Sequence, residues 1–223
     1  LIMTLKNEVE REFYLKLTHK EKYSVRELER QIDSSLFERT IIGNQKLSTV
    51  LKELHPKIEN NFKDNYVLEF LGLPTQHSES NLQKSLVQNM KNFILELGKD
   101  FIFVGEEYRV QVGNSDFFID LLFFHRELSA LVAFELKVGK FKPEHLGQLS
   151  FYLEALDRDV KKPHEKPSIG VLLCSDKDDE VVEYALSRHL SPTLISQYTL
   201  LLPDKKLLQA KLHEINAMLE VVE

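Results

Sequence analysis

Two neighbouring apolar runs decide the fold: FFIDLLFF at residues 117–124 and ALVAFELKV at residues 130–138. Apolar runs of this length, rich in β-branched and aromatic residues, predict strands that are buried on both faces. Each run nevertheless contains a carboxylate, Asp120 in the first and Glu135 in the second. Burying a lone charge is costly unless it is paired or bound to a metal. The two strands are therefore predicted to carry a functional site.

The spacing of these residues predicts which of them share a face. Side chains alternate along a strand, so Glu135 and Lys137 are expected on one side of the sheet. If the runs form a hairpin that turns near residues 127–128, Asp120 lies opposite Glu135 and points to the same side. Two carboxylates that close repel each other unless a cation lies between them or one keeps its proton. We therefore expect a cation at this pair, with Lys137 at its edge.

The types of residue indicate which cation. Carboxylate oxygens with open water positions suit Mg²⁺ or Mn²⁺, and no cluster of His and Cys suggests zinc. A metal held in this way can activate water and stabilise charge on a phosphate that is being cleaved. The predicted chemistry is metal-assisted hydrolysis.

The period of the apolar pattern changes from that of a helix to that of strands ahead of the two runs. Residues 81–97 predict a helix and residues 101–138 a meander of strands in one sheet. The pattern then predicts a helix at 143–156, a strand at 168–174, a helix at 178–189, a strand at 193–202 and a helix at 204–219. Clustered strands followed by alternating strand and helix predict an α/β fold with a mixed sheet flanked by helices.

The N-terminal part of the chain has a different pattern. Residues 1–77 are predicted to be mostly helical, and Ser24 with Glu27 forms a capping box at the start of a helix that runs to about residue 38. The polar stretch 72–81 contains Gly and Pro and is the best domain boundary. The predicted domains are a helical region at 1–77, the end of a longer helical domain, and a second domain at 78–223.

Two apolar stripes in the helical region suggest a protein partner. They are Val9/Phe13/Leu17 and Leu28/Ile32/Leu36. Helices that cannot bury such stripes on a small core tend to bury them on another chain. The stripes therefore predict a homodimer.

Composition narrows the function. The chain is 43% hydrophobic and 29% charged, which is ordinary for a soluble globular protein. The net charge of −6 argues against a surface that coats nucleic acid without specificity. The single cysteine, Cys174, excludes an intramolecular disulfide and favours a reducing cytoplasm. No apolar run approaches the roughly 18 residues of a membrane span, so we expect no membrane partner.

Four stretches together resemble a known family. They are FVGEEYRV (103–110), FFIDLLFFH (117–125), FELKVG (134–139) and HLGQLSFYL (145–153). Asp, a gap of about fifteen residues and then Glu-x-Lys is the signature of the PD-(D/E)XK nuclease superfamily. With the Gly-Gln-Leu-x-Phe-Tyr segment, the chain resembles the YhcG-like family of bacterial nucleases over about residues 80–215.

The resemblance implies a restriction-endonuclease-like core and assigns roles to its residues. Asp120, Glu135 and the backbone carbonyl of Leu136 would hold Mg²⁺ or Mn²⁺, and Lys137 would position the attacking water. Gln148, with Tyr152 one turn later, would line the site from the following helix. The implied activity is hydrolysis of phosphodiester bonds, in DNA ahead of RNA, in a setting of restriction or defence against mobile elements.

Some positions leave alternatives open. In this superfamily the first core helix often supplies a further acidic residue, and the corresponding place here holds Gln83. Ser80 and Gln83 also fit a capping box, so helix capping is at least as good an interpretation of Gln83. Glu79 is a displaced and less favoured substitute. Glu107 is a further candidate for lining the site, with simple solvation as the plainer interpretation.

Two functions of different class follow. The intact set of Asp120, Glu135 and Lys137 favours a metal-dependent nuclease. Gln83 and the acidic net charge favour a catalytically weak or inactive nuclease fold that mediates nucleic-acid or protein interaction.

Overall fold

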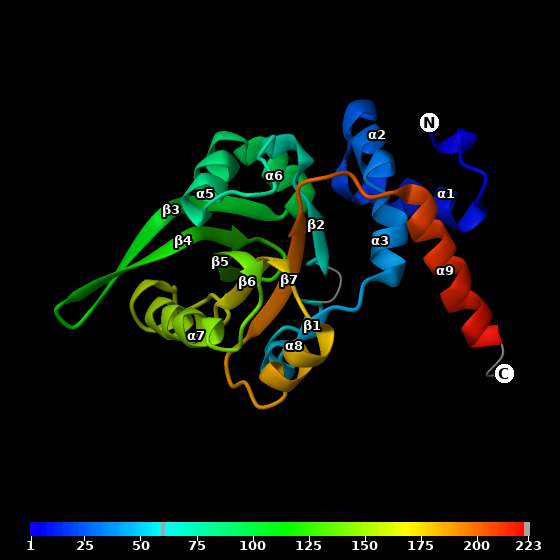
Figure 1. Cartoon of the computed structure of the whole chain (residues 1–223). Coiled ribbons are helices and arrows are strands. Elements are labelled where there is room, and N and C mark those ends of the chain that lie inside the picture. The colour runs from blue at the N-terminus through cyan, green and yellow to red at the C-terminus, as the bar shows by residue number, and fades with distance from the viewer. Residues whose placement is uncertain (59–60, 221–223) are drawn as a thin grey trace. The chain divides into compact units, whose positions relative to one another are not determined.

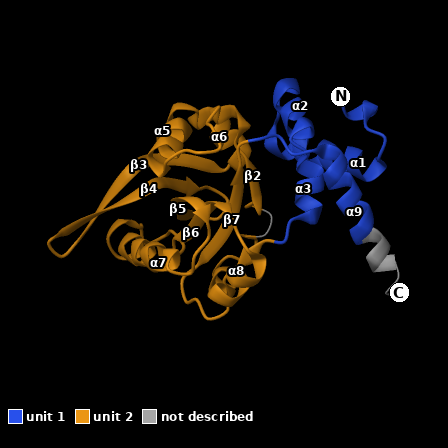
Figure 2. Ribbon diagram, in the orientation of Figure 1, with its two compact units in different colours: residues 1–44, 201–223 blue, residues 45–200 orange. Residues whose placement is uncertain are grey.

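The computed structural model describes residues 1–58 and 61–220, the last five of these without their side chains. The chain forms two compact units (Figure 2). Unit 1 combines residues 1–44 with the chain from residue 201 onward, and unit 2 comprises residues 45–200. Within the described residues, no helix is both long and apolar enough to cross a bilayer.

Unit 2 is built on a seven-stranded mixed sheet in the order β1-β7-β6-β5-β4-β3, with β2 also paired to β7 (Figure 1). The first three long strands form the predicted antiparallel meander, and β5, β6 and β7 run parallel. The strands are β1 (Lys46–Leu47), β2 (Asn65–Val67), β3 (Phe101–Val112), β4 (Ser115–His125), β5 (Ala130–Lys140), β6 (Ile169–Asp176) and β7 (Thr193–Thr199).

Helices cover both faces of this sheet, as the sequence predicted. On one face, α5 (Glu79–Gln88) and α6 (Met90–Leu97) bury Leu82, Leu86 and Phe93 (Figure 1). On the other, α7 (His145–Ala155) and α8 (Asp179–Leu186) bury Leu149 and Val182. Shorter helices are α4 (Thr49–Leu54), η3 (Glu69–Leu71) and the π-helical turn η4 (Leu156–Val160). The sheet thus separates two apolar cores.

The helix predicted at 81–97 is two helices. The break lies at Asn89, whose side-chain amide donates to the carbonyl of Ser85. An Asn side chain competes in this way with the backbone bonds of a helix. The first helix also begins earlier than predicted, because Ser78 is its N-cap and accepts from the amide of Asn81 at 3.1 Å. The predicted capping box of Ser80 and Gln83 is therefore wrong, and Glu79 occupies the first helical turn.

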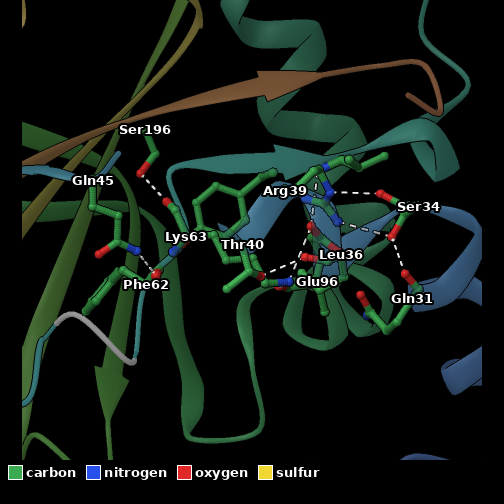
Figure 3. A network of polar contacts seen from close by, with 12 residues as sticks. Gln31, Ser34, Leu36, Arg39, Thr40, Gln45, Phe62, Lys63, Glu96 and Ser196 are labelled. Carbon is green, nitrogen blue, oxygen red and sulfur yellow. Dashed lines mark hydrogen bonds and ion pairs between the residues drawn. The ribbon is translucent and has the colours of Figure 1, made fainter. Parts of the chain in front are cut away.

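Unit 1 has a small core of its own. Its elements are η1 (Ile2–Thr4), α1 (Glu8–Glu21), α2 (Val25–Asp33), α3 (Leu36–Ile42) and α9 (Lys205–Glu220). The capping box of Ser24 and Glu27 is confirmed, but its helix ends at Asp33, and Ser35 adopts a left-handed backbone before α3. Arg39 holds this turn by donating from Nε to the carbonyl of Ser34 at 2.8 Å (Figure 3).

This core contains most of the stripes behind the homodimer prediction. Leu28 and Leu36 are buried in it, while Phe13, Leu17 and Ile32 pack partly against it. Leu212 of α9 contributes as well. Val9 remains 62% exposed. The sequence did not show that α9 returns to these helices, so the stripes have an intramolecular partner.

The units divide the chain at other positions than the predicted boundary at 77/78. Residues 45–77 belong with the sheet because β1 and β2 both pair with β7. Ser196 of β7 reinforces this by donating from its hydroxyl to the carbonyl of Lys63 at 2.7 Å (Figure 3). At the other end, the helix that follows residue 204 joins unit 1.

Candidate active site

The β4–β5 hairpin has the predicted register. Its pairs run from His125 opposite Ala130 to Leu121 opposite Phe134, so the next position places Asp120 opposite Glu135. The backbone ladder ends there. Instead of a β4 carbonyl, the carboxylate of Asp120 accepts from the amide of Leu136, at 2.8 Å from Oδ2. Because the backbone ladder ends here, the side chain of Asp120 can contact the backbone of β5.

The carbonyl of Asp120 has another partner, Gln83 of α5. The side-chain amide of Gln83 donates to this carbonyl at 3.0 Å. Gln83 therefore contacts the backbone of the site, and it lies at the place the family resemblance assigned to the first core helix. As a donor to a carbonyl, Gln83 positions β4 and does not offer a carboxylate.

Strand β4 also changes phase at Asp120. Ile119 packs in the core beside α7, whereas Leu121 packs in the core beside α5 and α6. In a regular strand, residues two apart share a face. The strand is therefore irregular at Asp120, which explains why this one polar residue can leave the apolar packing of its neighbours.

Glu135 is the most deeply buried charged group of the site. It is 2% exposed, and its Oε1 accepts from Lys137 Nζ at 2.8 Å. Its Oε2 is buried and has no hydrogen-bond partner within the described residues. Burial and then the charge of Asp120 raise the pKa of Glu135 to about 7. A buried carboxylate oxygen without a partner is costly and calls for a donor or a cation.

The same burial and charges shift the pKa values of Asp120 and Lys137. Burial raises the pKa of Asp120, against the opposing effects of the Leu136 amide and the charge of Lys137. Burial would lower the pKa of Lys137, but its bond to Glu135 and the surrounding negative charge outweigh that effect and raise it. The site therefore holds two carboxylates that are hard to ionise together and one ammonium that keeps its proton.

Glu79, in the first turn of α5, contacts the residues of β5 that follow Glu135. Its Oε1 accepts from the amide of Val138 at 3.3 Å, and its Oε2 lies 3.5 Å from Lys137 Nζ. The sequence interpretation gave Glu79 a low rank because Gln83 holds the position that corresponds to the acidic residue of the superfamily. The signal that could have found it was Ser78, a serine three residues before the amide that it caps.

Gln148 and Tyr152 lie one turn apart on α7 and form a pair. The amide of Gln148 donates to the hydroxyl of Tyr152 at 2.7 Å. Burial raises the pKa of Tyr152, and the charges of Glu135 and Asp120 add to the effect. The tyrosine is therefore close enough to feel both carboxylates, while Gln148 is exposed to solvent. The pair therefore brings a tyrosine of α7 near the two carboxylates.

The donor set fits a divalent cation, although it is not gathered into a finished cage. In residues 1–58 and 61–220, no three acidic, His or Cys groups lie together as metal ligands. Lys137 donates a hydrogen bond to Glu135 Oε1, and the Leu136 amide donates one to Asp120 Oδ2. The remaining buried oxygen of Glu135 and the repulsion between the carboxylates are what Mg²⁺ or Mn²⁺ would satisfy.

Comparisons with known proteins point to one family. Residues 59–213 match the model of the YhcG PDDEXK nuclease domain, and residues 1–39 match that of the DUF1016 N-terminal domain. A curated protein of Escherichia coli (strain K12), named "Putative nuclease YhcG", is 39% identical over 223 residues. The match covers 98% of this chain and 60% of that protein. The chain thus spans about 60% of the length of this relative.

Similarity to solved structures is low. A repair endonuclease from Pyrococcus abyssi aligns over 52% of this chain and 48% of its own, with a TM-score of 0.37 and 19% identity. EndoMS in complex with double-stranded DNA aligns over 53% of this chain and 46% of its own, with a TM-score of 0.34 and 16% identity. Likenesses of this size carry no argument about function.

Proposed function

Because the chain belongs to the YhcG family of PDDEXK nucleases, we propose that unit 2 hydrolyses phosphodiester bonds in DNA with the help of Mg²⁺ or Mn²⁺. One observation carries the proposal: Asp120 stands opposite Glu135 at the end of the β4–β5 ladder, with Lys137 bonded to Glu135. Glu135 Oε2 supports the proposal, because it is a buried carboxylate oxygen without a partner in the described residues and a divalent cation would satisfy it.

The residues divide into those that would hold the cation and those that act on substrate. Asp120, Glu135 and the carbonyl of Leu136 would hold it, and a bound cation would supply Lewis-acid stabilisation of charge on the phosphate. Lys137 keeps its proton, so its ammonium can donate to the attacking water or to a phosphate oxygen. Glu79 positions Lys137 through the contact at 3.5 Å.

Gln148 and Tyr152 supply polar groups from α7. The Gln148 carbonyl oxygen and the exposed position of this side chain leave it able to contact substrate, while Tyr152 fixes its amide. We propose that Gln148 orients the nucleic acid and that Tyr152 acts as its positioning residue.

DNA is proposed ahead of RNA on the superfamily resemblance. The net charge of −6 means that affinity for a phosphate backbone would come from local groups, not from the molecule as a whole. Because the chain spans 60% of its curated relative, the activity of a whole protein of this family is itself part of the proposal.

A second function has one observation in its favour. Lys137 pairs with both Glu135 and Glu79, so the ammonium occupies the position of a cation between acidic groups. A site closed permanently in this way would give an inactive nuclease fold that binds nucleic acid or protein. The two functions differ in one measurable respect, because only the nuclease exchanges this internal pairing for a divalent cation.

The test is a cleavage assay on the purified chain. Duplex DNA, single-stranded DNA and RNA are incubated with Mg²⁺, Mn²⁺ or EDTA, and Asp120→Ala protein is the matched control. We expect cleavage that requires metal and is absent from the Asp120→Ala protein. Equal cleavage by both proteins would assign the activity to another site. Absence of cleavage on every substrate, with binding retained, would favour the inactive module.

Two further expectations stay proposals. A homodimer now has narrower support, because only part of the stripe on α1, chiefly Val9, is left exposed. Sedimentation that shows a strict monomer at micromolar concentration would rule it out. A cytoplasmic location is proposed from the single buried cysteine, Cys174.

A further inference from the structure

Glu107 has an unusual backbone for a residue within a strand. Its φ is +43°, in the left-handed region that residues other than Gly and Asn rarely adopt. The other described residues that share this property without being glycine lie at helix ends or in a turn: Lys22, Ser35 and Ser129. Glu107 alone among them lies inside a strand, β3. Such strain persists only where the surrounding structure imposes it.

The position of Glu107 coincides with the candidate active site. Glu106 pairs with Leu121 and Tyr108 pairs with Ile119, so Glu107 stands opposite Asp120, and the ladder skips this one pair. The charge of Glu107 is among the groups that raise the pKa of Asp120. Both the strained backbone and the like charge oppose stability at this position.

Packing does not account for a glutamate here. The side chain of Glu107 is exposed, as is that of Glu106 beside it. Asn or Gly would fit the backbone with less strain, and a neutral residue would remove the repulsion with Asp120. Packing and backbone preference therefore do not favour a carboxylate in this position.

We propose that Glu107 is a further cation ligand of the site, which approaches the metal at Asp120 from β3. The inference rests on the proposed metal dependence. A second observation points to a cation at the same place: Glu135, 2% exposed, has a buried oxygen without a partner in the described part of the chain. A cation would turn the repulsion between Glu107 and Asp120 into shared coordination.

Glu107 of β3 would join Asp120 of β4 and Glu135 of β5 at the cation. In residues 1–58 and 61–220 such groups are not gathered as a ligand set, so binding would draw the exposed Glu107 side chain towards Asp120. The sheet irregularity then has a purpose, because a regular ladder through Glu107 and Asp120 would give both residues ordinary strand conformations.

The first test is Mn²⁺ affinity, measured by calorimetry on the whole chain. Glu107→Gln removes the charge and keeps the size of the side chain, and Glu106→Gln is the matched control on the same strand. We expect Glu107→Gln to weaken Mn²⁺ binding by at least ~10-fold, as loss of a supporting metal contact does. Glu106→Gln should bind as the parent does.

The result that would overturn the proposal is equal affinity of the Glu107→Gln protein and the parent. Asp120→Ala separates this outcome from failure of the proposed function. If Asp120→Ala abolishes Mn²⁺ binding and Glu107→Gln does not, only the role of Glu107 is wrong. If neither variant alters binding, the metal site itself is wrong.

The second test concerns the strained backbone and needs no metal. Asn tolerates a left-handed conformation better than Gln does, so metal-free Glu107→Asn protein should unfold at a higher temperature than Glu107→Gln protein, by about 2–4 °C. At residue 106, in regular strand conformation, Asn should give no such gain over Gln. Equal unfolding temperatures for the two variants at residue 107 would refute the strain on which the inference is built.

Discussion

The buried carboxyl of Glu135 makes the stability of the metal-free protein depend on pH in an unusual direction. Its pKa is about 7 in the folded chain, against an ordinary value of 4.5. Between these two values the folded state binds more protons than the unfolded state, so stability falls as pH rises. The loss begins near pH 4.5 and is complete a little above pH 7. A carboxylate with a lowered pKa would behave in the opposite way.

The size of the effect follows from the difference between about 7 and 4.5. One pH unit corresponds to about 1.4 kcal/mol, so the ionised Glu135 costs about 3 kcal/mol of folding free energy above pH 7. The side chain that carries this cost is 2% exposed, so solvent screens its charge little. This cost is a large fraction of the total stability of an ordinary domain.

The perturbation that isolates this cost is Glu135→Gln. Urea unfolding in EDTA, from pH 4.5 to pH 8, gives the free energy of unfolding of the variant and of the parent at each pH. The difference cancels other titrating groups that the substitution does not touch. We expect the variant to gain on the parent by about 3 kcal/mol between pH 4.5 and pH 8.

A control variant and the addition of Mn²⁺ complete this experiment. Glu106→Gln, a substitution at an exposed glutamate of β3, is the matched control. Mn²⁺ should restore the stability of the parent at pH 8, because a cation favours the ionised carboxylates. A difference between Glu135→Gln and the parent that does not change with pH would refute the reasoning, because Glu135 would then be ionised without cost.

Two further predictions concern catalysis. Lys137→Ala should leave Mn²⁺ affinity within a few-fold of the parent and lower kcat by ~10²-fold or more, because the ammonium acts on water and phosphate. Loss of metal binding in this variant would contradict that role. Glu79→Gln should lower kcat by roughly 10-fold, because Glu79 positions Lys137 through their contact at 3.5 Å. Glu53→Gln, at an exposed glutamate of α4, is the control. An unchanged kcat in Glu79→Gln protein would show that this contact has no function.

The sequence was sufficient for the centre of the fold because that part is local. A short turn between two apolar strands leaves one register that buries both runs, and the observed pairs from Leu121–Phe134 to His125–Ala130 are the predicted ones. The same register brought Asp120 next to Glu135. The unusual burial of charge in an apolar run identified this pair without any contact being known.

The errors arose where several local choices were nearly equal. Ser78 and Ser80 are both good N-caps, and the pattern alone did not separate them, so the helix start was placed two residues too late. Asn89 interrupts an apolar periodicity that continues across it, and its bond to Ser85 became visible only in the structure.

Other features depend on distant parts of the chain. Strands β1 and β2 have two and three residues, too few to show a period, and they form because β7 offers them an edge. The docking of α9 on the helices of unit 1 is likewise a tertiary contact. The left-handed backbone of Glu107 is contrary to residue preference, and no sequence rule would have predicted it.

The central claim is that Asp120 and Glu135 share one divalent cation. Anomalous diffraction from crystals grown with Mn²⁺ tests it most directly, because it locates the metal independently of activity. We predict an anomalous peak about 2.0–2.6 Å from a carboxylate oxygen of each residue, with Lys137 withdrawn from Glu135. A fully occupied Mn²⁺ elsewhere, with Lys137 still bonded to Glu135, would contradict the account.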